Sequence, residues 1–374
     1  MELKLDPNKT YAVALEGGGA RGAYQVGAWR ALEEAGIRYN AVSGTSVGSL
    51  NGAMMAMHAR KEAELLWTNI RFSQIMNVDD SVMERLMKRD IHTFGELKAL
   101  LKEARGVVRE GGFDIEPLRK MIAHVVDEDK IRQSDVDFFI MTYSLSDMKE
   151  LELDARALQP GELHDMLLAS AYFPAFKNEK LGGKRYADGG VQDVLPLHVL
   201  LEHGYRDIIA IRLHGVGFER RVKIPKNAGI VVISPNAELG NVLNFDREQS
   251  RANMRLGYYD AQRVLYGLQG KTYYIEKTFD EARAYQELSS MMRSAAPELS
   301  LRKLNEKLLP DLSKELGEKG DYYSLLIAYL EKAAGELSID PFRIITDEAL
   351  LALVWEHYHI KRPKTGILRY LARL

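Results

Sequence analysis

Short apolar runs alternate with amphipathic stretches along most of the chain. The apolar runs predict buried strands over residues 11–15, 41–42, 136–143, 207–213 and 229–233. Apolar residues at helical spacing predict helices over residues 22–35, 50–57 and 163–171, and around residues 198–204. Strands that alternate with helices favour an α/β fold, in which helices cover both faces of a mainly parallel central sheet.

The pattern changes after about residue 278, where helical periodicity continues almost without interruption to the end. We therefore predict an α/β domain over residues 1–275 and a helical C-terminal region over residues 276–374. Residues 60–135 are mixed in charge and mostly helical in pattern, which indicates an insertion that serves as a lid over a site. The helical region would cap the active site or form the surface of a homo-oligomer, and both alternatives stay open.

Composition excludes several classes of protein. Hydrophobic residues make up 46% and charged residues 28%, as in an ordinary globular chain. The chain has 51 basic and 53 acidic residues, a net charge of −2, which gives no field that would attract nucleic acid. It has no cysteine, so disulfides, thiolate zinc sites, iron–sulfur clusters and cysteine nucleophiles are excluded. No clear cluster of carboxylates and histidines stands out, and we expect neither a metal nor a cofactor.

The N-terminal residues are polar, and no apolar run reaches the roughly 18 residues of a membrane-spanning helix. We expect a cytoplasmic protein with at most a peripheral membrane contact. Two basic segments are candidates for that contact: Arg220 to Lys226, and the amphipathic residues 361–374. The alternative is that both are solvated faces or packing helices.

Gly44, Ser46 and Gly48 form a G-x-S-x-G motif. Glycines two positions on either side of a serine permit the tight strand-to-helix turn that exposes its hydroxyl as a nucleophile. A predicted strand precedes the motif and a predicted buried helix follows it, which is the required setting. The alternative is a glycine-rich turn without chemistry.

A second motif, Gly17-Gly18-Gly19-Ala20-Arg21-Gly22, also lies between a predicted strand and helix. Amides at such a helix start bind anions, so the turn would hold either a dinucleotide or the oxyanion of an acyl-transfer intermediate. A dinucleotide site needs an acidic residue at the end of the next strand, but Val42-Ser43-Gly44 stands there. The oxyanion hole is therefore favoured.

Asp188 heads an Asp188-Gly189-Gly190 turn and is a candidate for the base that accepts the serine proton. A histidine is the more usual base. None of the nine histidines lies in a recognisable motif, although His198, His203 and His214 follow Asp188 in the chain order of a Ser-Asp-His triad.

These motifs together resemble the patatin-like phospholipases. The family pattern G-G-G-x-[RK]-G, G-x-S-x-G, A-S-x-x-x-P and D-G-[GA] occurs here in order, at residues 17–22, 44–48, 169–174 and 188–190. The resemblance covers about residues 10–275. It implies a three-layer patatin-like fold and a carboxylic ester hydrolase that acts on phospholipids or other acyl lipids.

The resemblance also implies the roles of the site residues. Ser46 would be the nucleophile and Asp188 the base, with no catalytic histidine. The amides of Gly17, Gly18 and Gly19 would bind the oxyanion, and Arg21 would fix that turn or an anionic group of the substrate. Two alternatives stay open: a conventional Ser-Asp-His α/β-hydrolase, and an acyltransferase that uses the same acyl-enzyme. The sequence does not identify the lipid.

Overall fold

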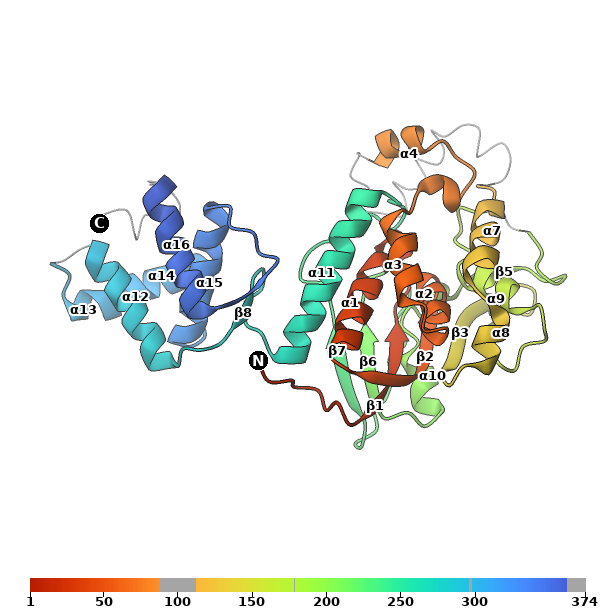
Figure 1. The fold of residues 1–374 in the computed structure, drawn as a ribbon, viewed down its shortest axis with the longest axis horizontal. Helices are drawn as coiled ribbons and strands as arrows, with labels where there is room; N and C mark the ends of the chain where they lie inside the picture. Colours follow the sequence, from red (N-terminus) through yellow and green to blue (C-terminus); the bar gives the residue numbers. More distant parts are fainter. Residues whose placement is uncertain (88–111, 178, 296–297, 362–374) are drawn as a thin grey trace. The chain divides into compact units, whose positions relative to one another are not determined.

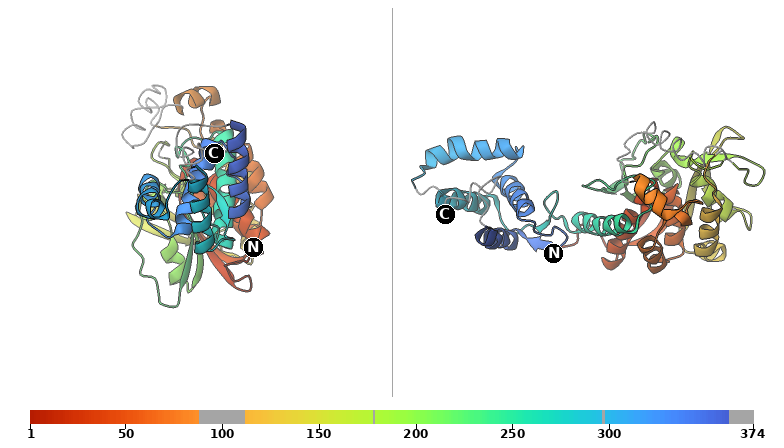
Figure 2. Two further views of the ribbon diagram at one scale, coloured as in Figure 1. Left: turned by 90° about the vertical axis from the view of Figure 1, so that its left-hand side faces the viewer. Right: turned by 90° about the horizontal axis from the view of Figure 1, so that it is seen from above.

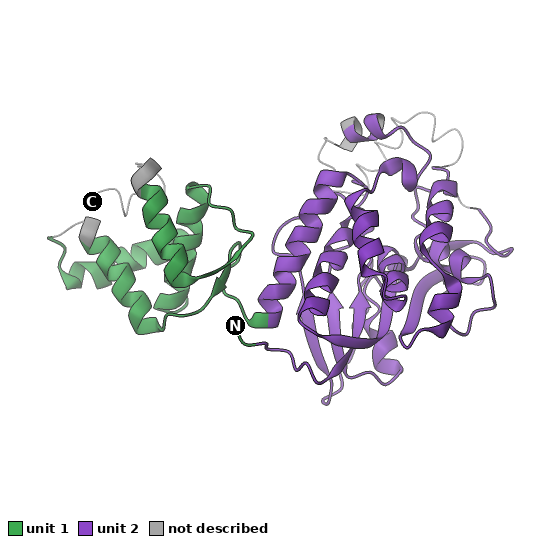
Figure 3. Cartoon of the chain, viewed as in Figure 1, with its two compact units in different colours: residues 1–2, 266–374 green, residues 3–265 purple. Residues whose placement is uncertain are grey.

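The computed structural model describes residues 1–87, 112–177, 179–295 and 298–361. It divides into two compact units, residues 3–265 and residues 266–374 together with 1–2 (Figures 1 and 3). The boundary that the sequence predicts, between residues 275 and 276, lies ten residues later. The amphipathic segment 361–374 lies outside the described residues except for Lys361. Within the described part of the chain, no helix has the length and apolar character needed to cross a bilayer.

The larger unit is built on one sheet in the order β4-β3-β2-β1-β6-β7, with the short β5 paired to β3. Strands β1, β2, β3, β6 and β7 are parallel, whereas β4 and β5 run antiparallel to β3. The mainly parallel α/β fold that the sequence predicts is therefore confirmed. The strands are β1 (Thr10–Leu15), β2 (Arg38–Thr45), β3 (Asp137–Ser144), β4 (Lys149–Asp154), β5 (Tyr186–Asp188), β6 (Asp207–Ile211) and β7 (Gly229–Ile233).

Helices pack on both faces of this sheet. Val199 and Leu200 of α10 pack against Ala12, Ala41 and Phe139 on one face. The helix α2 packs against Val42 and Phe138, the neighbours that point to the other face. Its helices are α1 (Ala23–Glu34), α2 (Val47–Ala56), α3 (Arg60–Thr68), α4 (Asp80–Met87), α7 (Glu116–Val125), α8 (Glu128–Gln133), α9 (Leu163–Ser170), α10 (Leu197–Glu202) and α11 (Arg247–Tyr266), with 3-10 turns η1 (Gly19–Gly22), η2 (Phe72–Gln74) and η3 (Gly189–Val191).

The long helix α11 runs alongside α1, as Figures 1 and 2 show. The two backbones touch at glycines. A Cβ atom on Gly257 would lie 2.0 Å from the carbonyl oxygen of Tyr24, and one on Gly27 would lie 1.9 Å from that of Met254. Only glycine permits this approach, because both distances are far below van der Waals contact.

Two strands of the sheet were not predicted from the sequence. The residues of β4, KELELD, place a charged side chain at every second position of an edge strand, so no apolar run marks it. The strand β5 has only three residues, too few for any periodicity to appear. Both are paired with β3, and the second of them carries Asp188.

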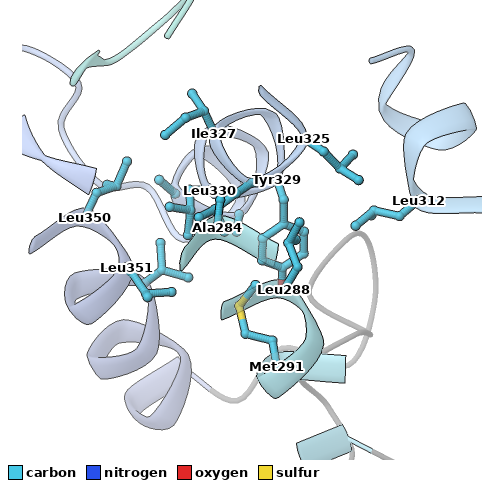
Figure 4. Close-up of a cluster of buried hydrophobic side chains, with 14 of the residues drawn as sticks. Ala284, Leu288, Met291, Leu312, Leu325, Ile327, Tyr329, Leu330, Leu350 and Leu351 are labelled. Carbon is cyan, nitrogen blue, oxygen red and sulfur yellow. The ribbon is translucent and has the colours of Figure 1, made fainter. Parts of the chain in front are cut away.

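The smaller unit has a hydrophobic core of its own. Figure 4 shows Leu288 and Met291 of α12 beside Leu330 of α15 and Leu351 of α16, all of them buried. The unit is mostly helical, as the sequence predicts, and adds a two-stranded parallel pair. Its elements are β8 (Tyr274–Glu276), α12 (Glu281–Ala295), α13 (Leu301–Lys303), the π-helical turn η4 (Leu304–Leu308), α14 (Leu309–Leu316), α15 (Tyr322–Glu336), β9 (Ile344–Thr346) and α16 (Asp347–Lys361).

Candidate active site

Ser46 occupies a sharp turn between β2 and α2. Its backbone has φ 55° and ψ −125°, a conformation that a non-glycine residue adopts only under constraint. The flanking glycines allow the turn. A Cβ atom on Gly44 would lie 2.3 Å from the carbonyl oxygen of Gly48, and one on Gly48 would lie 2.3 Å from that of Leu15. The G-x-S-x-G sequence thus folds as the strand-to-helix elbow that displays a serine hydroxyl.

A buried serine holds this elbow in place. The Ser46 N–H donates to Oγ of Ser170 at 2.9 Å, and the Ser170 hydroxyl donates to the carbonyl oxygen of Met141 at 2.5 Å. Ser170 is fully buried at the end of α9. The sequence reasoning quoted Ser170 within the A-S-x-x-x-P motif but gave it no role. The A-S-x-x-x-P motif is the sequence feature from which this role could have been predicted.

The pairing of strands in the sheet brings Asp188 close to Ser46. Strand β5 pairs with β3 so that Asp188 lies opposite Thr142, while Met141 of β3 lies opposite Thr45 of β2. The Asp188 carboxylate accepts a hydrogen bond from Gly190 N–H at 2.8 Å. Burial raises the pKa of Asp188 to about 6, although hydrogen bonds from the Ser46 side chain and from Gly190 N–H oppose the rise. A carboxyl with this pKa is a workable proton acceptor near neutral pH.

The glycine-rich turn presents two amides. Gly17 N–H donates to the carbonyl oxygen of Val194 at 2.9 Å, so this amide is already occupied. Among the described residues, the N–H groups of Gly18 and Gly19 have no acceptor. Gly19 has φ +56°, and a Cβ atom there would lie 2.1 Å from the carbonyl oxygen of Val242. Gly22 closes the turn, where a Cβ atom would lie 2.4 Å from Cγ2 of Val47.

Arg21 is committed to the protein backbone. Its Nε donates to the carbonyl oxygen of Gly240 at 2.8 Å, and its Nη1 donates to those of Leu213, at 3.3 Å, and His214. Partial burial lowers the pKa of Arg21, against the attraction of Glu16 and Glu238. Of the two roles expected for Arg21, these bonds fit the fixing of loops around the turn.

The structure adds Glu16, which the sequence reasoning passed over. Its carboxylate is 1% exposed and accepts hydrogen bonds from the N–H groups of Leu213, His214 and Gly215 at 2.5, 3.2 and 3.2 Å. A buried carboxylate with three amide donors holds the loop after β6 against the glycine turn. A lone acid before a glycine run gives no sequence signal for this contact, because the partners lie about 200 residues away.

A chain of buried polar side chains supports the same turn from α3. Trp67 Nε1 donates to Oδ1 of Asn51 at 2.9 Å, and Asn51 Nδ2 donates to the carbonyl oxygen of Gly22 and to Oε1 of Gln25. Gln25 in turn donates to the carbonyl oxygen of Glu16 at 2.7 Å. Helix α3 of the predicted insertion is thereby connected to the glycine turn.

Six of the seven predicted site residues line a single cavity of about 1090 Å³: Gly17, Gly18, Gly19, Arg21, Ser46 and Asp188. The seventh, Gly22, belongs to the same glycine turn. Much of its wall is apolar, and the helices α2, α3 and α7 contribute Met54, Leu66, Leu118, Met121 and Ile122 to it. The volume lies just above the range of about 300–1,000 Å³ typical of ligand sites. Two helices of the predicted insertion, α3 and α7, contribute to this wall; that they act as a lid stays a prediction.

His198 takes part in an ion-pair network away from this cavity. Its Nδ1 lies 2.7 Å from Asp193 and its Nε2 lies 2.9 Å from Glu152. Burial disfavours the charged ring, but the two neighbouring carboxylates outweigh it and raise the pKa of His198. Glu150, Glu152 and His198 bring ligand atoms within 4.8 Å of one another, a grouping the sequence did not reveal. Arg220 pairs with Glu150 and Glu152, so the network already holds a balancing cation.

The two other histidines of the rival triad differ in position. The ring of His203 packs against that of Phe139 at a tilt of 35°, with centroids 4.2 Å apart. His214 lines the cavity, and its Nε2 lies 3.1 Å from Oγ of Ser234. Within the described part of the chain, no histidine acts on the Asp188 carboxyl.

Comparisons with known proteins agree on one family. The model of the patatin-like phospholipase family matches residues 13–201. Lysophospholipase NTE1 of Mycosarcoma maydis is 26% identical over 208 residues, which are 53% of this chain and 9% of that protein. Patatin-like phospholipase domain-containing protein 6 of Mus musculus is 53% identical over 47 residues, which are 13% of this chain and 4% of that protein. The chain thus spans less than a tenth of the length of these relatives.

Among solved structures, VipD from Legionella pneumophila is 14% identical, with a TM-score of 0.43 over 98% of this chain and 90% of that one. The family match covers half of the chain and includes the serine elbow, the glycine turn and Asp188. The chain therefore belongs to the patatin-like phospholipase family and carries its lipid-hydrolase domain.

Proposed function

We propose that this protein is a serine lipid acyl hydrolase in which Ser46 is the nucleophile and Asp188 the general base. One observation carries the proposal: Ser46, displayed on a constrained elbow, and the half-buried carboxyl of Asp188 line the same largely apolar cavity, and the Ser46 side chain acts on the pKa of that carboxyl. A serine nucleophile with a proton acceptor beside it is the arrangement that covalent acyl transfer requires.

In the first step the Ser46 oxygen attacks the carbonyl carbon of an acyl ester, and its proton passes to Asp188. The carbonyl oxygen becomes an oxyanion, which the free N–H groups of Gly18 and Gly19 stabilise. Collapse of this intermediate breaks the ester C–O bond. The alcohol leaves with the proton from Asp188, and the acyl group stays on Ser46 as an ester.

In the second step water attacks the acyl-enzyme and Asp188 again takes the proton. The fatty acid is released and the Ser46 hydroxyl is restored. An alcohol acceptor in place of water would give acyl transfer by the same chemistry.

The shape of the cavity favours an acyl lipid as substrate. Its apolar wall suits a hydrocarbon chain, and the serine elbow lies where that wall meets polar groups. The relatives named lysophospholipases point to a phospholipid with one acyl chain. We therefore propose a lysophospholipid as the preferred substrate.

A substrate panel tests this function. Wild type and Ser46→Ala are compared on a lysophospholipid, a diacyl phospholipid, a triacylglycerol and a short-chain ester, and free fatty acid is measured. We expect the lysophospholipid to be hydrolysed fastest and Ser46→Ala to be inactive on all four. Hydrolysis by Ser46→Ala at the wild-type rate would contradict the proposal, and preference for another ester would correct only the substrate.

The raised pKa of Asp188 predicts an acid limb in the pH dependence. Because the base must be deprotonated, kcat/KM should be constant above about pH 7 and fall about tenfold per unit below pH 6. An ordinary aspartate would hold activity down to about pH 4. The measurement is kcat/KM on a soluble ester at each pH, with recovery of activity on return to neutral pH as the control. Full activity at about pH 4.5 would contradict the assignment.

Substitution of the histidines separates the dyad from a triad. His198→Ala, His203→Ala and His214→Ala should each keep kcat within about threefold of wild type, because catalytic loss of a general base costs about 100-fold or more. The assay is ester hydrolysis, with thermal unfolding as the control, since His198 is buried among carboxylates. A folded His214→Ala without activity would favour a triad.

A further inference from the structure

Exposed apolar side chains gather at the mouth of the cavity that contains Ser46. Val191, Val216 and Phe218 are 46%, 71% and 60% exposed, and all three line the cavity. Single exposed apolar residues are normal on a protein surface, whereas several on the rim of one cavity indicate a contact surface. We call these three residues the rim patch.

The rim patch is joined to the turn that carries Asp188. Phe218 N–H donates to the carbonyl oxygen of Gly190 at 2.9 Å, and Val194 N–H donates to that of Phe218 at 2.7 Å. A Cβ atom on Gly217 would lie 2.5 Å from the Gly190 oxygen, so the two backbones are in direct contact. Gly190 N–H also donates to Asp188. Whatever binds the rim patch is therefore held over the mouth of the catalytic cavity.

The loop that bears two rim residues continues into a basic stretch, residues 215–226. It contains four basic residues and one acidic residue, a net charge of +3, in a chain whose net charge is −2. Arg220 pairs with Glu150 and Glu219 with Arg212. Three cations are exposed and form no ion pair with any described residue: Arg221, Lys223 and Lys226.

We propose that the rim patch and this basic stretch together bind the surface of a membrane that contains anionic lipid. Exposed apolar side chains next to unpaired cations are the two features that a peripheral protein uses on such a surface. The inference rests on the proposed function for its purpose, since an acyl lipid at the surface then lies at the cavity mouth. The binding itself requires no turnover.

Vesicle flotation tests the surface. Wild type, Ser46→Ala and the double variant Val216→Ser/Phe218→Ser are mixed with vesicles of phosphatidylcholine with or without phosphatidylglycerol, and the bound fraction is measured. The matched control is Val232→Ser/Leu301→Ser, which removes two side chains that are 46% and 57% exposed but do not line the cavity. Thermal unfolding shows that each variant is folded, and size-exclusion chromatography gives its oligomeric state.

We expect wild type, Ser46→Ala and the control to bind the anionic vesicles, and the rim variant to partition about tenfold or more weakly. Added salt should weaken the binding, because the cations contribute to it. Two results would overturn the proposal: no binding by wild type, or binding by the rim variant equal to that of wild type. If the rim variant binds equally and has also lost a dimer that wild type forms, the rim patch is a dimer surface instead. Failure of the proposed function would give a different result. The wild type would then be inactive on lipids, but its vesicle binding would still depend on the rim patch.

Discussion

Asp188→Asn should lower kcat for ester hydrolysis by at least about 100-fold, because the amide cannot accept the serine proton. The substitution keeps the size of the side chain and an oxygen that accepts from Gly190 N–H, which lies 2.8 Å from Asp188 Oδ1. The loss should therefore appear in kcat with little change in KM. A folded variant that retains more than about a tenth of wild-type turnover would contradict the role of Asp188.

The same variant should be more stable than wild type above neutral pH. The pKa of Asp188 is about 6 in the folded protein, whereas an aspartate outside a folded structure has a pKa of 3.8. The folded state therefore binds the proton more tightly than the unfolded state. The ionised, partly desolvated carboxylate thus costs stability: nothing below about pH 4, an increasing amount between pH 4 and 6, and at most about 3 kcal/mol above pH 6.

Asn carries no such charge. Denaturant unfolding should show Asp188→Asn more stable than wild type at about pH 8 and equal to it near pH 4. A stability gain that is the same at both pH values would contradict the charge of Asp188 as its cause. A gain in stability with loss of activity is typical of residues that a protein keeps for chemistry.

Gly19→Ala should lower kcat by about 100-fold or more, the usual cost of losing one oxyanion donor. Gly19 has φ +56°, and the added Cβ would lie 2.1 Å from the backbone oxygen of Val242. Because backbone cannot yield as a flexible side chain can, the turn must shift and carry the Gly18 and Gly19 amides away from the oxyanion. The measurement is kcat on a soluble ester at a temperature at which the variant is folded.

The matched control is Gly36→Ala. Gly36 has φ +73°, but a Cβ atom there has nothing within 4 Å. This variant bears the conformational cost of about 1–2 kcal/mol in stability and should keep wild-type kcat. Wild-type turnover by a folded Gly19→Ala would remove the glycine turn from the mechanism.

The parallel core of the fold could be predicted because its strands read as apolar runs, most clearly in β1 and β6, whose residues are nearly all buried. Residues 229–233 were predicted at their observed bounds. The strands β4 and β5 could not, because one is a charged edge strand and the other is too short for a pattern. The helices α3 and α7 carry apolar residues at helical spacing, but their place in the cavity wall depends on tertiary packing.

The candidate site divides in the same way. Ser46 and the glycine turn stand out because their backbone conformations demand glycine at fixed positions, which is a local property. Asp188 was the weakest of the candidates until the family pattern was added, since an Asp-Gly turn alone is common. Glu16 and Ser170 act through contacts with residues 197 and 124 positions away, and one sequence contains no record of such contacts.

Covalent labelling tests the central claim, that Ser46 is an activated nucleophile. Wild type and Ser46→Ala are treated with a fluorophosphonate, and intact mass is measured before and after digestion to locate the adduct. The account predicts a single adduct on the wild type, on the peptide that contains Ser46, and none on Ser46→Ala. An adduct of equal yield on Ser46→Ala, or a wild type that hydrolyses lipid yet takes no adduct at Ser46, would contradict it.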